Sequence, residues 1–487
     1  MQIDSSTDLE GVILKSTPLV IDLDGTLIKS DLLIESILAL IRARPNNVFH
    51  PLIWLMSGKP YLKGKLANIS KIDVACLPYE NQVVALIKEE RAKGREIIMA
   101  TASHKIYADQ IAEHLQLFDR VLATEGEVNL SANNKGKRLV EEYGKRGFDY
   151  VGNSYDDLPV WQVARKAYVV NPARGVEAKA RKIGNVETVI SFQNIFVKSF
   201  IKEMRFHQWM KNFLIFIPLL ASHILDQANL LLNGVLAFII FGLCASSVYV
   251  LNDLLDLSDD RHHATKRHRP FASGQLSLKF GLLAFPFLLF AAFAGSLLLL
   301  PWKFTATLAS YYILTLAYSI WLKRMMLVDV ITLALLYTLR LIAGTFAFGV
   351  KLTFWLLAFS MFMFLSLALV KRYAELWEAR NKGKVEKARG RGYYPDDLEM
   401  ISSLGASSGY LSIMVLAFYI QDRATIVLYS HPQIIWLACP LLLLWISRIW
   451  LLTHRGEMHD DPVLFAIKDR FSLLVGVAIG AIFWIAT

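Results

Sequence analysis

Residues 245–274 read ASSVYVLNDLLDLSDDRHHATKRHRPFASG, and this stretch decides how the chain is interpreted. If the apolar helix that leads into it continues, Asn252, Asp256 and Asp260 recur every four residues, and Asp253 falls on the same face. Carboxylates held so close together repel one another unless a cation lies among them, and hard oxygen ligands suit Mg²⁺. The spacing therefore predicts a Mg²⁺ site at the end of a membrane helix, with Asp253, Asp256 and Asp260 as its ligands.

Basic residues follow the acids directly, at Arg261, Lys266, Arg267 and Arg269. Their side chains can donate hydrogen bonds to phosphate oxygens that a metal ion leaves uncovered. Carboxylates, metal and bases together predict a site for a diphosphate. The alternative is a solvated loop beside the membrane whose basic residues serve only the membrane topology.

The overall composition supports a membrane protein. The chain has 487 residues, of which 54% are hydrophobic and 19% charged, and its mean hydropathy is +0.39. These values exclude a disordered chain and are too apolar for an ordinary soluble enzyme. A net charge of +10 on such a chain favours a membrane surface or an anionic substrate. Nucleic acid is not expected as a partner, because the acidic cluster would repel its backbone.

The cysteines are few and widely spaced. Cys76, Cys244 and Cys439 show neither a disulfide framework nor the spacing of a zinc site. The sequence therefore predicts three inert thiols.

Apolar segments near the roughly 20 residues that a bilayer requires fill the chain after residue 212. Nine are expected, centred on 212–225, 232–251, 279–300, 303–321, 327–349, 353–370, 404–421, 433–453 and 469–487. If the chain enters the first segment from the inside, the inward connections 252–279, 322–326, 371–403 and 454–468 carry 17 Lys or Arg and the outward ones three. The positive-inside rule then predicts a multi-pass protein of the bacterial inner membrane with its N-terminal part in the cytoplasm. The core of a soluble helix bundle is the alternative, which nine such segments in succession disfavour.

The N-terminal part has a different pattern. Short apolar runs at 18–22, 96–100 and 148–152 alternate with amphipathic helical stretches, which predicts an α/β domain with a parallel sheet covered by helices. Residues 32–90 interrupt this alternation and are expected to form a helical cap.

The expected domains are 1–190, a linker with an amphipathic entry at 191–211, and a membrane domain at 212–487. The polar, acidic start at Met1–Glu10 lacks the basic flank and apolar run of a secretory signal.

The motif from Asn252 to Gly274 resembles the first aspartate-rich motif of the UbiA superfamily of intramembrane prenyltransferases. It reads N-D-x-x-D-x-x-x-D-R-x-H-x-x-K-x-x-R-P-x-A-S-G. The resemblance covers about residues 200–487 and implies an all-α fold of nine transmembrane helices around a central cavity.

A second aspartate-rich motif is usual in that superfamily, but the matching region here is VKRYAEL at 370–376, with one acid and two bases. This string is similar to that of decaprenyl-phosphate phosphoribosyltransferases. Further similarities to the same branch are MRFHQWMKN at 204–212, YSIWLK at 318–323 with Asp329, LRLIAG at 339–344, and DDPVLFAIKDR at 460–470.

This resemblance implies transfer of a 5-phosphoribosyl group from phosphoribosyl diphosphate to a polyprenyl phosphate. The expected substrate-binding residues are Asn252, Arg261, Lys266 and Arg269 beside the Mg²⁺ ligands, and Lys323, Arg340, Lys371 and Arg372 for the lipid phosphate and a cationic clamp. Two alternatives stay open. One is prenyl transfer from a diphosphate to an aromatic or other small acceptor, and the other is a non-catalytic lipid carrier or scaffold.

Arg340 falls inside an expected span, where a charge is costly enough to indicate function. It is expected either to line a pocket or to form a buried ion pair, with Asp329 as a candidate partner. Lys371 and Arg372 have a plainer alternative, since bases are usual at cytoplasmic helix ends.

The N-terminal string LVIDLDGTL at 19–27 carries two acids at the end of an apolar strand, where parallel sheets present their chemistry. One of these carboxylates, Asp22 or Asp24, can attack phosphorus while the other donates or accepts the leaving-group proton.

The same string resembles the first motif of haloacid-dehalogenase-like phosphatases, and IIMATAS at 97–103, Lys135 and VGNSYDD at 151–157 resemble the other three. The resemblance implies the nucleophile Asp22, the acid/base Asp24, the phosphate contacts Thr101 and Lys135 (or Lys137), and a Mg²⁺ site with Asp22, Asp24 and Asp157. One departure is Asn153, where the family has aspartate. The domain is therefore expected either to be an active phosphatase, which removes the 5′-phosphate of the product, or a degenerate regulatory or docking domain.

Overall fold

The computed structural model describes residues 17–126, 129–191, 196–222, 227–383, 391–422, 429–458 and 461–487. The chain forms two compact units: unit one comprises Met1–Glu203 with Leu251–Leu283, and unit two comprises Met204–Val250 with Ala284–Thr487. The polar start of the chain, residues 192–195 of the expected linker, and Asp460 of the 460–470 string lie outside the described residues.

Unit one is built on a six-stranded sheet with the order β3-β2-β1-β4-β5-β6, and every neighbouring pair is parallel. The strands are β1 (Leu19–Ile21), β2 (Ile97–His104), β3 (Arg120–Thr124), β4 (Asp149–Gly152), β5 (Ala167–Val170) and β6 (Val186–Ile190). The predicted parallel α/β domain is confirmed. The three apolar runs of the sequence become β1, β2 and β4, the centre of the sheet.

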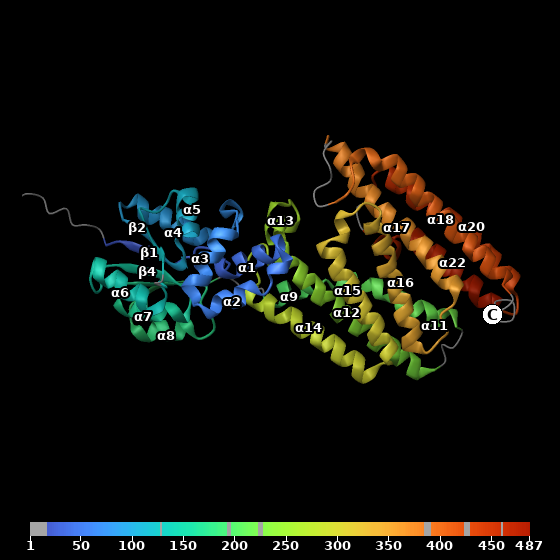
Figure 1. Cartoon of the computed structure of the whole chain (residues 1–487), viewed down its shortest axis with the longest axis horizontal. Coiled ribbons are helices and arrows are strands. Elements are labelled where there is room, and N and C mark those ends of the chain that lie inside the picture. Colours follow the sequence, from blue (N-terminus) through green and yellow to red (C-terminus); the bar gives the residue numbers. More distant parts are fainter. Residues whose placement is uncertain are drawn as a thin grey trace, which may run out of the picture. The chain divides into compact units, whose positions relative to one another are not determined.

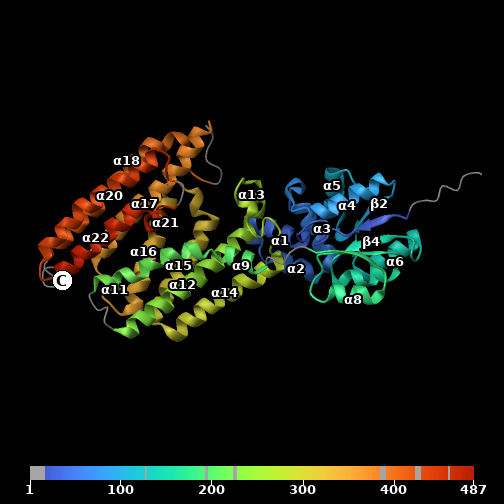
Figure 2. The same ribbon diagram turned by 180° about the vertical axis from the view of Figure 1, so that it is seen from behind.

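Helices cover both faces of this sheet (Figure 1), and Figure 2 gives the view from behind. They are α4 (Asn81–Ala92), α5 (Lys105–Leu115), α6 (Ala132–Tyr143), α7 (Leu158–Val163) and α8 (Val176–Ile183). Successive β1 side chains point to opposite faces. Leu19 and Ile21 join the core of α4 and α5, whereas Val20 joins that of α6, α7 and α8. Both faces are therefore dry, as an all-parallel sheet requires.

Helical segments follow β1 in the region expected to form a cap. They are α1 (Leu32–Ala43), η1 (Pro45–Asn47), α2 (His50–Met56), α3 (Lys59–Ile69) and the 3₁₀ helix η2 (Val74–Cys76). Leu40, Leu62 and Leu66 form a small apolar core with a contact from Trp54. Helix α4 packs on the sheet through Val83 and so belongs to the main domain.

The acidic stretch is interrupted rather than continuous. Helix α12 (Ala228–Leu255) ends before Asp256, which caps the separate helix α13 (Leu257–His262), and the 3₁₀ helix η5 (Lys266–His268) follows. The prediction that these acids share one face of a continuous helix is therefore wrong beyond Leu255.

The regular elements in the described residues of unit two are all helices. Its elements are α10 (Phe206–Trp209), η4 (Met210–Phe216), α11 (Ile217–Ala221), most of α12, α14 (Leu278–Leu299) from residue 284 onward, α15 (Trp302–Ile320), η6 (Leu322–Arg324), α16 (Val328–Phe348), α17 (Phe354–Asn381), η7 (Pro395–Asp397), α18 (Leu398–Gln421), η8 (Pro432–Leu437), α20 (Ala438–His454), α21 (Pro462–Lys468) and α22 (Arg470–Ala486). Helix α9 (Phe196–Met204) ends at the boundary between the two units.

Six helices among the described residues are long and apolar enough to cross a membrane, and the pair α21 and α22, bent by 81°, makes a possible seventh. This supports a membrane domain without confirming nine spans. The segment expected at 303–321 is helix α15, which is not one of the six. The segment at 212–225 begins with only the short helices η4 and α11.

Candidate active sites

The first candidate site lies where β1 ends. Asp22 follows the last residue of that strand, and its Oδ1 accepts a hydrogen bond from Lys135 Nζ at 2.6 Å. Lys135 comes from α6 and is buried, whereas Lys137 is exposed, so the structure selects Lys135 of the two candidates. The same ammonium also donates to the hydroxyl of Tyr150 at 2.8 Å. Asp22 thus lies beside an ammonium group that can also bind a phosphate.

Burial changes the proton affinity of this pair of acids. It raises the pKa of Asp22 to about 7, although Lys135 pulls in the opposite direction. Burial, together with the charge of Asp31, raises the pKa of Asp24 to about 6. Asp24 accepts hydrogen bonds from the Leu32 backbone N–H at 2.8 Å and from the Ser103 hydroxyl. A carboxyl with a pKa near neutrality suits a general acid/base.

Thr101 and Asp157 both lie in this neighbourhood, but in supporting positions. Thr101 is fully buried within β2, and its Oγ1 accepts from the backbone N–H of Ser103 at 2.9 Å. Asp157 accepts from the Asn153 backbone N–H and from Ser154 through Oδ2, and from the Tyr150 hydroxyl at 2.7 Å through Oδ1. Its Oδ2 therefore holds the turn after β4, and its Oδ1 holds Tyr150 of the strand itself.

Two residues of this site carry more weight than their sequence motifs indicate. Tyr150 bridges Lys135 to Asp157, a role that its place inside an apolar strand does not reveal. Asn153 has a buried Oδ1 with no hydrogen-bond partner among the described residues. Its amide packs against Gly25, where a Cβ would lie 2.2 Å from Nδ2. An unsatisfied acceptor beside Asp24-Gly25 fits a metal ligand, so these residues suit the Mg²⁺ that the resemblance implies.

The second candidate site lies at the end of α12. Asp253 and Asp260 are each 3% exposed, and Arg269 Nη1 donates to Asp253 Oδ1 at 2.9 Å and to Asp260 Oδ2 at 2.7 Å. Burial and the charge of Asp253 raise the pKa of Asp260 to about 6, although Arg269 lowers it. Two buried carboxylates that converge on one positive charge fit a divalent cation.

The other residues predicted for this site are placed differently. Asp256 Oδ1 pairs with Arg42 of helix α1 at 2.8 Å. Arg261 is bound bidentately to Glu35, with distances of 2.7 and 2.9 Å, and donates to the Ala272 carbonyl. Asn252 is half-buried in α12, and Lys266 is exposed in η5. The structure therefore brings together Asp253, Asp260 and Arg269, and it engages Asp256 and Arg261 with the α1 segment.

The third candidate site is a polar cluster inside unit two. Asp461, at the start of α21, accepts from Lys211 Nζ at 2.8 Å and lies 3.4 Å from Lys371 Nζ. The hydroxyl of Tyr337 also donates to this carboxylate, at 3.1 Å. Lys211 and Asp461 stand in strings that the sequence singled out, but neither was assigned a role. Only the packing of η4, α17 and α21 reveals that they meet.

Arg340 is 4% exposed in helix α16. It donates to Asn212 Oδ1 at 3.2 Å, to the Tyr311 hydroxyl at 3.1 Å and to the Leu336 carbonyl. The ion pair with Asp329 is not formed, because Asp329 pairs with Arg372 at 2.7 Å. Arg340 thus keeps its charge among neutral groups, and the pocket role stays a prediction.

Arg372 is held by other residues than Arg340 is. Arg372 is 1% exposed and is held by Asp329 and Glu375, an arrangement that suits a support for α17 rather than an open substrate contact. Lys323 lies half-buried in η6.

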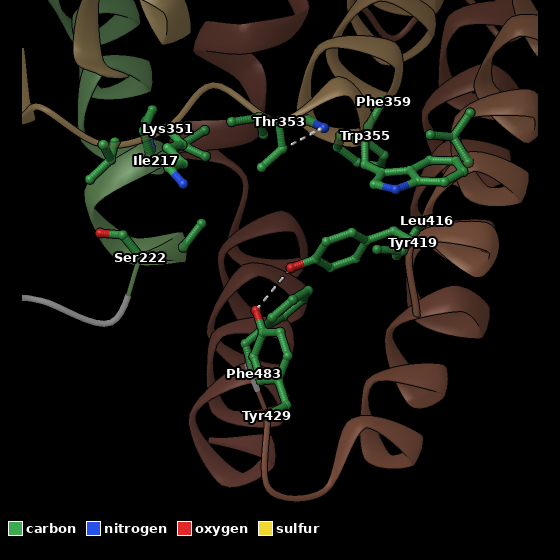
Figure 3. A pocket seen from close by; sticks show the side chains of 15 residues that line it. Ile217, Ser222, Lys351, Thr353, Trp355, Phe359, Leu416, Tyr419, Tyr429 and Phe483 are labelled. Carbon is green, nitrogen blue, oxygen red and sulfur yellow. Dashed lines mark hydrogen bonds between the residues drawn. The ribbon is translucent and has the colours of Figure 1, made fainter. Parts of the chain in front are cut away.

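An apolar cavity of about 500 Å³ opens elsewhere in unit two. Figure 3 shows the Tyr419 and Tyr429 hydroxyls facing each other, 3.4 Å apart, with Trp355 and Phe359 on the neighbouring helix. Trp355 lies at the start of α17, about 24 Å along the helix from Lys371. The cavity is therefore distinct from the Asp461 cluster.

Comparisons with known proteins agree with this architecture. Residues 214–475 match the UbiA prenyltransferase family, and residues 19–162 match the haloacid dehalogenase-like hydrolases. The chain is 39% identical to the uncharacterized protein y4nM of Sinorhizobium fredii, across 97% of this chain and 91% of that one.

Two further relatives match a little over half of this chain. The nodulation protein NoeC of Azorhizobium caulinodans is 35% identical, over 58% of this chain and 92% of its own length. A decaprenyl-phosphate phosphoribosyltransferase of Mycobacterium tuberculosis is 30% identical, over 60% of this chain and 93% of its own length.

The chain therefore belongs to the UbiA prenyltransferase family and carries a haloacid dehalogenase-like domain in front of the family's membrane domain. It is a UbiA-superfamily transferase, which confirms both resemblances identified in the sequence.

Proposed function

We propose that this transferase moves a 5-phosphoribosyl group from phosphoribosyl diphosphate to a polyprenyl phosphate. The observation that carries the proposal is the basic character of the α17 end, where Lys371 and Lys211 share one carboxylate, Asp461. Two ammonium groups against a single carboxylate leave an excess of positive charge, which suits an anionic acceptor better than a second metal ion. The relative named as a decaprenyl-phosphate phosphoribosyltransferase supports the same assignment.

In this proposal the acidic end of α12 serves the donor. Asp253 and Asp260 would hold Mg²⁺, which supplies positive charge to the departing diphosphate. Asn252, Lys266 and Arg269 provide hydrogen bonds to the remaining phosphate oxygens.

The lipid phosphate is the acceptor, and Lys211, Lys371 and Arg340 hold it in unit two. It attacks the anomeric carbon of the ribose, and because it is already an anion it needs no general base. The bond from that carbon to the diphosphate oxygen breaks as the new carbon–oxygen bond forms.

We also propose the membrane arrangement that the basic residues indicate. The chain crosses the bacterial inner membrane nine times, with unit one on the cytoplasmic side. The six to seven spans recognised by length and composition are compatible with this count, because α15 and the segment with η4 and α11 supply two shorter or less apolar crossings.

A paired-substrate assay tests the transferase proposal. Membranes containing the protein are incubated with phosphoribosyl diphosphate and polyprenyl phosphate, and in parallel with a prenyl diphosphate and 4-hydroxybenzoate. A phosphoribosylated lipid is expected in the first mixture only. Product in the second mixture alone would replace the proposal with prenyl transfer, and metal-independent lipid binding without turnover would indicate a carrier.

Replacing Asp253 tests the role of the acidic helix end. Asp253→Asn should lower the transfer rate at least about 100-fold, because it removes a charged ligand while keeping the shape of the side chain. The matched control is Asp259→Asn, since Asp259 is 55% exposed, and a change below about threefold is expected. Equal losses in both variants, measured as initial rates at saturating Mg²⁺, would contradict a specific role for Asp253.

We further propose that the haloacid dehalogenase-like domain is an active phosphohydrolase that removes the 5′-phosphate of the lipid product. The support is the Asp22–Lys135 pair and the unsatisfied oxygen of Asn153 beside Asp24. Asp22 is the nucleophile, Asp24 donates and accepts the leaving-group proton, and Lys135 binds the phosphate.

Asp22→Asn should reduce Mg²⁺-dependent phosphate release at least about 1,000-fold, because an amide cannot form the phosphoaspartyl intermediate. Asp156→Asn is the control, since Asp156 is an exposed acid of the same motif. Release of inorganic phosphate from sugar phosphates and from the phosphoribosylated lipid is the measurement. No release from any of them by the unaltered protein would leave a docking or regulatory domain.

A further inference from the structure

We propose that unit one holds a zinc ion between the cap and helix α13, with Asp73, Cys76 and His262 as its protein ligands. Asp73 caps the 3₁₀ helix η2, Cys76 is the last residue of that helix, and His262 is the last residue of α13. Within the described residues they are the only group of three His, Cys, Asp or Glu side chains whose ligand atoms all lie within 4.8 Å of one another. This site is separate from both Mg²⁺ sites and does not depend on the transferase proposal.

The distances between the ligand atoms are close to those of a tetrahedral zinc site. His262 Nε2 lies 3.4 Å from Cys76 Sγ and 2.9 Å from Asp73 Oδ2. Zinc bonds of about 2.3 Å to sulfur, 2.05 Å to nitrogen and 2.0 Å to oxygen require separations of about 3.6 Å and 3.3 Å at tetrahedral angles. Each of these two separations needs to change by only a few tenths of an ångström to admit the ion, and the third pair, Cys76 and Asp73, lies within 4.8 Å.

The orientation of the imidazole points to the same conclusion. His262 Nδ1 lies 2.7 Å from the carbonyl oxygen of Ser258, so this nitrogen carries the proton that it donates there. In the neutral ring Nε2 then carries a lone pair and no proton. It faces a carboxylate oxygen of Asp73, which is also an acceptor. Either a second proton or a metal ion must lie between them. A histidine that donates its other N–H to a backbone carbonyl is the usual arrangement at metal sites.

The types of ligand select the metal. A thiolate, an imidazole and a carboxylate suit Zn²⁺, whereas Mg²⁺ prefers oxygen ligands alone. Asp73 and Cys76 also line a hollow of about 250 Å³, together with Glu35, Arg42 and Arg261. Three protein ligands beside an open space leave a fourth position for water.

Such an ion would fasten α13 to the cap beside two existing ionic contacts. Arg261 precedes His262 and binds Glu35 of helix α1, and Arg42 of the same helix binds Asp256. These contacts are ion pairs, whereas a metal bond couples its ligands through coordination and forms only when the ligands are deprotonated. Zinc would thus fix the end of α13 to the cap, at a position two residues after Asp260.

Cobalt substitution of the full-length protein in detergent tests this site. Co²⁺ added to metal-stripped protein should produce one equivalent of a thiolate-to-cobalt charge-transfer band, and one equivalent of Zn²⁺ should abolish it. Cys76→Ser should remove the band, and His262→Asn should weaken Co²⁺ binding at least about 100-fold. The matched controls are Cys439→Ser, a buried thiol of unit two, and His50→Asn, an exposed histidine of the cap, and both should keep the band.

Hydrogen exchange provides a measurement that does not rely on folding of the variants. Adding Zn²⁺ to the unaltered, metal-stripped protein should slow exchange of the α13 amides at least tenfold and leave those of α6 unchanged. An absent charge-transfer band in the unaltered protein, or a band that persists in Cys76→Ser, would reduce the three residues to a hydrogen-bonded ion pair with a neighbouring thiol and overturn the proposal.

Discussion

Asn153 stands where the fourth motif of the family has aspartate. Its Oδ1 is buried without a hydrogen-bond partner among the described residues, and its amide lies against Gly25, whose φ of +78° only glycine adopts easily. The side chain therefore has the position of a metal ligand but not the charge of one.

Restoring that charge gives a direct test. Asn153→Asp should lower the Kd of the N-terminal domain for Mg²⁺ roughly tenfold, because ligand charge strengthens binding of a hard cation. Calorimetric titration in an Asp253→Asn background isolates this site from the one at α12. Asp156→Asn, which alters an exposed neighbour, should leave the Kd unchanged, and an unchanged Kd in Asn153→Asp would place Asn153 outside the coordination sphere.

Arg340 illustrates what a residue's position in the sequence can and cannot decide. A charge inside an apolar helix predicts function or an ion pair, and the sequence left both open. The structure gives Arg340 neutral partners, Asn212 and Tyr311, while Asp329 binds Arg372. The sequence could not anticipate this exchange of partners, because it depends on how α16 and α17 pack.

At the scale of the element, strand β4 is secured by a buried ionic network. Asp149 is fully buried, and Oδ2 lies 2.6 Å from Arg95 and 2.7 Å from Arg165. Burial alone would raise the pKa of Asp149, but the hydrogen bonds from the two arginines outweigh it and hold the pKa below 3.8. A pKa lowered on folding means that the ionised carboxylate stabilises the domain at neutral pH.

Asp149→Asn should therefore destabilise β4 by about 3 kcal/mol at pH 7, since it leaves two guanidinium groups without their counter-charge. The stabilisation in the unaltered protein is complete above pH 3.8 and is lost as the pH falls through the lower folded pKa. Hydrogen exchange of the β1 and β4 amides at pH 7 and pH 3 measures both effects.

The surface pair of Lys166 and Glu187 is the control for that experiment. Both side chains are at least 40% exposed, so Glu187→Gln should cost less than about 1 kcal/mol. A loss in Asp149→Asn that is equally large at both pH values would show that packing, rather than ionisation, holds the strand.

The break between α12 and α13 shows what the spacing of the acids could not predict. Four-residue spacing put Asn252, Asp256 and Asp260 on one helical face, but the helix ends at Leu255. Asp253 and Asp260 still converge on Arg269, whereas Asp256 turns to Arg42. Spacing drew attention to these acids, but it could not locate the break, because the partner residues come from other segments.

At the scale of the whole molecule, unit two contains a close contact of backbone against backbone between α16 and η4. A Cβ on Gly344 of α16 would lie 2.1 Å from the carbonyl oxygen of Ile215 in η4. Gly476 of α22 is also helical, but no described atom lies within 4 Å of the position of its Cβ. A side chain at position 344 would therefore clash with η4, whereas a side chain at position 476 would meet no described atom.

Gly344→Ala should destabilise unit two by about 1–3 kcal/mol, because the overlap with Ile215 exceeds any gain in helix propensity. Gly476→Ala should be neutral or stabilising by up to about 1 kcal/mol, because alanine is the better helix former. Thermal inactivation midpoints of the two variants in the same detergent provide the comparison. A lower midpoint for Gly476→Ala than for Gly344→Ala would contradict the close contact.

Local patterns in the chain were enough to predict the parallel α/β domain, the apolar helical domain after residue 212, both family resemblances and most of the residues placed in the candidate sites. They were enough because strand alternation, span length and motif spacing are local properties of the chain. Which of those residues meet depends on how distant elements pack. Asp461 joins Lys211 across 250 positions, and Cys76 faces His262 across 186. Such contacts depend on the packing of distant elements, which no local pattern records.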